Sequence, residues 1–192
     1  MCWTCETTAP LLHWLKYASA SQVDRFRQLV QQRRIGAGAG YLHLTPLCTF
    51  EQLVRSLQPI RMLRESLGLP LKVAIHHDVN GLPWPITQSL LDAGVELLMM
   101  GINVHFGGFP LVRPLLFRWQ GADGRPLLSY NGEHYNHLQT AIDAHYENLD
   151  AAEHALHGYL SRLALAGYGS DFLCLTATHS NAVDNNPPPD AP

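Results

Sequence analysis

The sequence predicts an α/β fold built around a largely parallel sheet, and three observations favour this class. Short apolar runs alternate along the chain with segments whose apolar residues recur at helical spacing. The runs 71–75 and 95–100 flank a helical segment within about 30 residues, the length of a strand–helix–strand unit. Both runs are continuously apolar, as in strands that are buried on two faces. We therefore expect the elements to alternate as in a barrel or a doubly wound sheet.

The first elements are expected to be a helix, a turn and a strand. A helix is predicted over 21–34, with Ser21 and Asp24 as its N-terminal cap. The glycine-rich segment 36–40 follows a helix and not a strand, so it predicts a turn and not a nucleotide-binding loop. Residues 41–44 are then expected to form a short strand.

Capping signals open the next two helices. Thr49 and Gln52 form a capping box at the start of a helix that ends near Gly68. After the strand 71–75, a short helix begins near Pro85, because the ring of proline suits the first helical turn.

The second half of the chain is expected to contain a β-hairpin, a helix and a strand. The two apolar stretches of 115–130 flank Asp123-Gly124, which is a hairpin turn signal. Asn148 can cap the last helix, and 172–176 is predicted to be a final strand. We find no internal repeat and no linker, so residues 1–192 are expected to form a single domain.

The composition excludes several classes of protein. The net charge is −3 and the thirteen Lys and Arg residues form no basic stripe, so nucleic acid is not an expected partner. No apolar run approaches the roughly 18 residues of a membrane-spanning helix, and no membrane partner is expected. Four cysteines in 192 residues do not make a disulfide framework, and Cys2 and Cys5 lack the second pair of a zinc site. A reducing compartment, the cytoplasm, is therefore expected.

Asp78 is the main candidate for a catalytic residue. It lies just beyond the predicted strand 71–75, and parallel α/β enzymes gather their active sites at the carboxyl ends of strands. A carboxylate there can be a nucleophile toward an acetal carbon, a metal ligand, or both, and His76 and His77 can bind a metal. Alternatively, Asp78 makes a polar turn before Gly81 and His77 satisfies backbone groups. The spacing alone does not decide between these interpretations.

Other polar and aromatic residues give weaker signals. Trp3, Trp84 and Trp119 lie near predicted strand ends or loops, where their rings can stack on sugars, although core packing explains them equally well. Glu133 lies close to two histidines, His134 and His137, in a further candidate polar loop. No serine has the sequence context of a hydrolase nucleophile elbow.

Several segments together resemble the N-terminal catalytic domain of the glycoside hydrolase family 38 α-mannosidases. The segment 3–6 is similar to the second strand of that domain, and 77–81 falls where the family carries its aspartate nucleophile. The pattern Phe-x-Trp-x-Gly-x-Asp-Gly over 117–124 resembles the hairpin that follows the fifth strand of the family. These segments occur in the order of the family and cover most of the chain.

The resemblance implies a partial (β/α)7-type barrel with parallel strands and an inserted hairpin. It further implies a bound zinc ion and a retaining mechanism, in which Asp78 is nucleophile and zinc ligand. His77 is a second candidate ligand, Asp184 is the candidate general acid, and Trp84, Trp3 and Trp119 are candidate substrate-binding residues. The first-strand His-x-Asp pair of the family is expected upstream of Met1.

These implications give a leading hypothesis and two alternatives. The leading hypothesis is an α-mannosidase-like glycoside hydrolase, truncated at both ends and nearly inactive as this chain. Its expected partners are a carbohydrate substrate and the remainder of the full-length enzyme. A metal-dependent polysaccharide deacetylase is the first alternative, although its Asp-Asp and His-x-x-x-His pairs are not visible. A non-catalytic carbohydrate-binding domain is the second.

Overall fold

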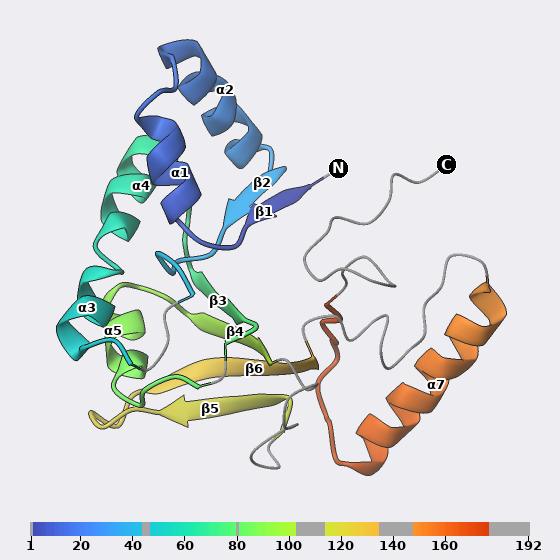
Figure 1. Ribbon diagram of the computed structural model, residues 1–192. Coiled ribbons are helices and arrows are strands. Elements are labelled where there is room, and N and C mark those ends of the chain that lie inside the picture. The colour runs from blue at the N-terminus through green and yellow to red at the C-terminus, as the bar shows by residue number, and fades with distance from the viewer. Residues whose placement is uncertain (1, 44–46, 80, 103–113, 135–147, 177–192) are drawn as a thin grey trace. The chain divides into compact units, whose positions relative to one another are not determined.

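The computed structural model describes residues 2–43, 47–79, 81–102, 114–134 and 148–176 (Figure 1). The chain divides into two compact units, one of residues 1–99 with 117–130 and the other of residues 100–116 with 131–192. The fold is mixed α/β and contains parallel strands, as predicted. Within the described ranges the strands form a two-stranded and a four-stranded sheet and no closed barrel, so the partial barrel stays a prediction. The single domain over 1–192 also stays a prediction.

The first sheet consists of β1 (Trp3–Cys5) and β2 (Ile35–Ala37), which pair in parallel. Hydrogen bonding continues beyond β2, because the amide of Gly38 donates to the carbonyl of Cys5 at 2.8 Å. The amide of Ala39 then donates to the carbonyl of Val73, the first residue of β3, also at 2.8 Å. The segment that follows β2 therefore starts beside both β1 and β3.

The strand predicted at 41–44 does not form over its described residues, 41–43; the strand of this region is β2, at the start of the glycine-bearing segment. The lack of a side chain at Gly38 explains the difference. A Cβ atom at this position would lie 2.3 Å from the backbone oxygen of Glu6. The glycine lets the segment after β2 approach β1 closely enough for hydrogen bonding. Gly38 therefore serves sheet packing and not a turn.

The first helices are α1 (Ala9–Leu15), which was not predicted, and α2 (Ala20–Gln31). The cap of α2 is Ser19 with Gln22, two residues before the predicted Ser21 and Asp24. The amide of Gln22 donates to Ser19 Oγ at 3.3 Å, and the amide of Ser19 donates to Gln22 Oε1 at 2.8 Å. Two amide donors at the N-terminus of the helix are satisfied in this way, so the helix starts earlier than predicted.

The helix predicted after Thr49 forms as two helices, α3 (Phe50–Arg55) and α4 (Pro59–Leu67). The capping box at Thr49 is confirmed, and α4 ends at Gly68, whose φ of 71° is left-handed. The division falls before Pro59, because proline has no amide to bond back into a preceding helix.

The predicted strand–helix–strand unit is confirmed as β3 (Val73–His77), α5 (Ile86–Asp92) and β4 (Leu97–Ile102). The second sheet has the order β3-β4-β6-β5. The strand β3 ends two residues later than predicted, so Asp78 follows its last residue directly. The core of the first unit is formed by side chains at most 2% exposed, among them Ile60, Leu63, Leu67, Leu69, Leu71, Val95, Leu98 and Leu127.

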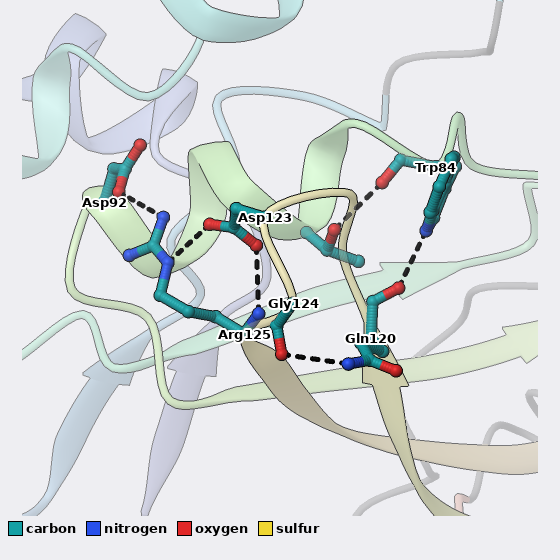
Figure 2. Close-up of polar contacts among 7 residues, drawn as sticks. Trp84, Asp92, Gln120, Asp123, Gly124 and Arg125 are labelled. Atoms are coloured by element: carbon teal, nitrogen blue, oxygen red, sulfur yellow. Dashed lines mark hydrogen bonds and ion pairs between the residues drawn. The ribbon is translucent and has the colours of Figure 1, made fainter.

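The predicted hairpin is confirmed as β5 (Leu116–Gln120) and β6 (Pro126–His134). Figure 2 shows its turn beside α5, where Arg125 forms ion pairs with Asp123 and with Asp92. Gly121 permits this contact, because a Cβ there would lie 2.7 Å from Oγ1 of Thr87. The glycine of the motif is thus required by packing.

Among the described residues of the second unit, α7 (Leu149–Leu165) is the one long helix. The predicted cap is confirmed, since the amide of Ala151 donates to Asn148 Oδ1 at 3.0 Å. The strand predicted at 172–176 is wrong, because these residues form no strand. A strand forms only where a neighbouring strand offers hydrogen bonds, which an apolar run does not ensure. None of the helices in the described ranges has the length and apolar composition needed to cross a lipid bilayer.

Candidate functional site

One carboxylate links three segments of the first unit. Glu6 directly follows β1, His43 lies six residues beyond β2, and His77 ends β3. His43 Nε2 lies 3.3 Å from Glu6 Oε2, and His77 Nδ1 lies 3.1 Å from Glu6 Oε1. Both oxygens of the carboxylate are therefore in contact with an imidazole. We call Glu6, His43, His76 and His77 the Glu6 cluster.

The two imidazoles keep Glu6 ionised. Hydrogen bonds from His43 and then from His77 lower the pKa of Glu6 to about 2, although partial burial acts in the opposite direction. At neutral pH the side chain is therefore a carboxylate, which accepts hydrogen bonds and donates none.

His76 is held in its neutral form. Burial and, to a smaller extent, the neighbouring His43 lower the pKa of His76 to about 4. The rings of His43 and His76 meet edge to face, with centroids 5.8 Å apart. A neutral imidazole has one nitrogen that donates and one that accepts a hydrogen bond.

Several polar atoms of this region have no partner. In the part of the chain that the structure describes, the buried side-chain nitrogen and oxygen atoms without a hydrogen bond are Thr8 Oγ1, His43 Nδ1, Ser66 Oγ, His76 Nε2 and His77 Nε2. Three of them belong to the Glu6 cluster. Each such atom costs about 1–3 kcal/mol, so a cluster of them at strand ends indicates a site and not a structural network.

Asp78 lies at the edge of the Glu6 cluster. It is exposed, and it follows His77 with a φ of 56° in the left-handed region. Aspartate tolerates this region better than most residues, but the conformation still costs about 1 kcal/mol or more. An exposed carboxylate in this position can act as a nucleophile or as a base.

The predicted metal ligands do not form a complete metal site. Among the described residues, no group of three or more His, Cys, Asp or Glu side chains could hold a metal ion. His77 and Asp78 are neighbours in the chain, but His77 Nδ1 faces Glu6. Two ligands fall short of the three or four that zinc takes from proteins, so these residues alone do not fit the predicted zinc ion.

The cysteines do not contribute a metal or redox pair. None of the four forms a disulfide in the described part of the chain; Cys2 is exposed and Cys5 is buried. The thiol of Cys5 donates to the carbonyl of Thr7 at 3.1 Å, and burial raises its pKa. A buried thiol of this kind is unreactive.

The three tryptophans that are candidates for sugar binding lie in different settings. Trp84 is 54% exposed, and its Nε1 donates to the carbonyl of Gln120, the neighbour of the half-buried Trp119 in β5. Trp3 is exposed at the start of β1, at the opposite end of that strand from Glu6. The structure thus brings Trp84 to the strand that carries Trp119, and sugar binding by any of the three stays a prediction.

Some of the predicted site residues are not among the described residues. Conversely, two residues of the Glu6 cluster were not predicted. Asp184 and His137 lie outside the described residues, as do the side chains of Glu133 and His134. The sequence analysis did not identify Glu6 and His43 as site residues. Their signal is their position, since each is a polar residue that follows a parallel strand.

The parallel strands, with a carboxylate and several imidazoles at their carboxyl ends, define an α/β protein of the kind that carries an active site at this edge. The family model for the glycosyl hydrolases family 38 N-terminal domain matches residues 3–185. The chain therefore belongs to this family, and the resemblance seen in the sequence is confirmed.

Two solved structures share the fold. An alpha-mannosidase from Enterococcus faecalis V583 aligns with a TM-score of 0.64 and 17% identity, over 92% of this chain and 20% of that protein. A 4-alpha-glucanotransferase from Thermococcus litoralis aligns with a TM-score of 0.52 and 16% identity, over 69% of this chain and 22% of that protein. The chain thus spans about a fifth of the length of each. A comparison with curated proteins finds no match.

Proposed function

We propose that the protein carrying this sequence is an α-mannosidase-like glycoside hydrolase in which Asp78 is the nucleophile of a retaining mechanism. Family membership supports the class of reaction. The observation that carries the assignment of Asp78 is its position, since it is an exposed carboxylate directly after β3, beside the Glu6 cluster. A partial barrel that presents this edge to a carbohydrate substrate is part of the proposal.

The chemistry follows from the exposed carboxylate. In the first step an oxygen of Asp78 bonds to the anomeric carbon, while the bond from that carbon to the leaving oxygen breaks and the leaving group takes a proton from an acid. In the second step water replaces the carboxylate at the same carbon, so the configuration is retained overall. Asp184 is the proposed acid.

The predicted zinc ion is a separate part of the proposal. Zinc would polarise and hold sugar hydroxyl groups, and Asp78 with His77 would contribute ligands to it. These two residues do not suffice by themselves, so further ligands must come from residues other than the described ones. Zinc content, measured by elemental mass spectrometry of the purified protein, tests this prediction directly.

Trapping of the covalent intermediate tests the role of Asp78. The full-length protein that carries this sequence is incubated with a fluorinated α-mannosyl fluoride, which forms the glycosyl-enzyme but releases it slowly, and the labelled peptide is identified by mass spectrometry. We expect one label, on Asp78. A label on another carboxylate, or a protein that neither reacts nor hydrolyses aryl α-mannosides, would refute the assignment.

A matched carboxylate provides the control. Asp24 is exposed on α2 and pairs with Arg27 at 2.9 Å, away from any strand end. Asp24→Asn should leave labelling and turnover unchanged, whereas Asp78→Asn should abolish both. An acetylated carbohydrate, assayed in parallel, separates the alternatives, because a deacetylase releases acetate from it and a carbohydrate-binding domain releases no product from either substrate.

A further inference from the structure

We propose that Glu6 is a positioning residue that holds His43 and His77 in one neutral tautomer each and, through His77, holds the turn that carries Asp78. The importance of this turn for the reaction rests on the proposed function. The hydrogen-bonding arrangement of Glu6 with its two imidazoles does not.

The tautomers follow from the contacts of the carboxylate. A carboxylate only accepts hydrogen bonds, so each imidazole nitrogen that faces it must carry a proton. His77 faces Glu6 with Nδ1 and His43 faces it with Nε2. In the neutral form, His77 therefore has its proton on Nδ1 and His43 has its proton on Nε2. The two histidines should thus be opposite tautomers.

The remaining nitrogens show that this arrangement is not a closed structural network. His77 Nε2 and His43 Nδ1 are buried and have no hydrogen-bond partner among the described residues. Under the proposed tautomers, both are acceptors with a free lone pair. A carboxylate that orients an imidazole so that its second nitrogen stays available is the usual arrangement for histidines that act on a ligand.

The connection to Asp78 is covalent and short. His77 is the last residue of β3, and Asp78 follows it in the left-handed region, at a φ of 56°. A strained backbone of this kind persists only where its surroundings hold it. The contact of His77 with Glu6 holds the residue before the strained one, and it joins that residue to the end of β1.

Glu6→Gln is the variant that tests the tautomers. Glutamine has the same shape, but its amide offers one acceptor oxygen and one donor nitrogen. The imidazole that faces the oxygen should keep its tautomer, and the imidazole that faces the nitrogen should change to the other one. Long-range nitrogen–proton correlation spectra of the labelled protein at pH 8, where histidines are largely neutral, distinguish the two tautomers of each ring.

Controls separate this role from simple space filling. Glu153 lies 3.7 Å from His157 on the exposed surface of α7, so Glu153→Gln provides a glutamate–histidine pair outside the cluster. It should leave His43 and His77 unchanged. If Glu6 only fills space, Glu6→Gln should also leave both tautomers as they are, and that result would overturn the proposal. Should Glu6→Gln fail to fold, a wild-type spectrum with the proton of His77 on Nε2 would overturn it equally.

Two further readouts address the turn at Asp78. The coupling between the amide and α protons of Asp78 reports its φ, and it should change in Glu6→Gln. The turnover number on aryl α-mannosides should fall about 10- to 100-fold with a smaller change in KM, as is common for groups that orient a reacting residue. An unchanged coupling and an unchanged turnover number would show that Glu6 does not position Asp78. A wild-type protein without turnover would refute the proposed function, and the tautomers would still test Glu6.

Discussion

Two polar networks of the first unit differ in how completely they are satisfied. Around the hairpin turn, Arg125 pairs with Asp92 and Asp123, and the side chain of Gln120 donates to the carbonyl of Gly124 (Figure 2). Trp84 adds a bond to the carbonyl of Gln120 at 2.7 Å. In this region, the described side chains leave no buried polar atom without a partner.

The Glu6 cluster is arranged in the opposite way. Each oxygen of its carboxylate contacts one imidazole, of His43 or of His77, but three imidazole nitrogens of the cluster are buried and have no partner in the described part of the chain. A satisfied network stabilises a fold, whereas unused hydrogen-bonding capacity costs free energy and persists where a function needs it. We therefore infer that the hairpin network stabilises the fold and that the Glu6 cluster takes part in the chemistry.

The sharpest test of this comparison exchanges one aspartate in each region. Asp78→Asn should lower turnover on aryl α-mannosides at least about a thousandfold, because an amide is a poor nucleophile, while the melting temperature stays close to that of the wild type. Asp123→Asn should do the reverse: it should lower the urea midpoint by weakening the bonds to Arg125 and leave turnover unchanged. Equal losses of turnover in the two variants would contradict the separate roles of the two networks.

Two glycines provide the next test. Gly38→Ala places a Cβ 2.3 Å from the backbone oxygen of Glu6, and backbone cannot move aside without disrupting the sheet. We expect a loss of about 3 kcal/mol or more. Gly121→Ala meets the side chains of Thr87 and Asp123 at 2.7 and 3.0 Å, which can rotate, so about 1–2 kcal/mol is expected. Urea unfolding measures both, and a reversed order would contradict the packing described.

Between pH 6.5 and 4, acid should weaken the cluster and leave the hairpin unchanged, because desolvation, which raises the pKa of Asp123, is outweighed by the bonds to Arg125, which hold it below its ordinary value of 3.8. The folded state keeps the pKa of His76 near 4, below its ordinary value of 6.5, so between these values the unfolded chain binds a proton that the folded chain does not. Stability from this group is complete above pH 6.5 and is lost as the pH falls to 4, by up to about 3 kcal/mol.

Glu6 adds a second loss at lower pH. Its pKa is lowered to about 2 from 4.5, so its contribution is present above pH 4.5 and disappears toward pH 2. Urea unfolding at several pH values resolves the two steps. In His76→Gln the step between pH 6.5 and 4 should be absent, and its persistence would show that another group is responsible.

The smallest effect is expected from the exposed ion pairs of the hairpin. Arg125→Ala removes its contacts with Asp92 and Asp123, but the arginine side chain is about half exposed. Exposed pairs contribute little to stability, and salt screens them. The variant should therefore unfold slightly earlier in urea at low salt, by an amount that decreases at 1 M NaCl, and its turnover should be unchanged.

Local sequence signals predicted much of this fold. The capping residues Thr49 and Asn148 and the Asp123-Gly124 turn stand where the structure has them, because each depends on contacts within a few residues. The strand at 41–44 and the strand at 172–176 were predicted wrongly, since a strand depends on neighbours that are distant in sequence.

The candidate site shows the same limit. Asp78 was predicted at a strand end because its position follows from the apolar run before it. The bridge from Glu6 to His43 and His77 could not be predicted, since it joins residues 37 and 71 positions apart in sequence. The parallel pairing of β1 with β2, the close approach at Gly38 and the hydrogen bond from Ala39 to Val73 of β3 bring these side chains together.

The backbone of Asp78 also limits how this protein can be made more robust. Glycine adopts a φ of 56° without steric cost, so Asp78→Gly should raise the melting temperature while it removes the reacting group. A screen for heat resistance would then select inert molecules at this position. Durability and turnover therefore compete at a single residue.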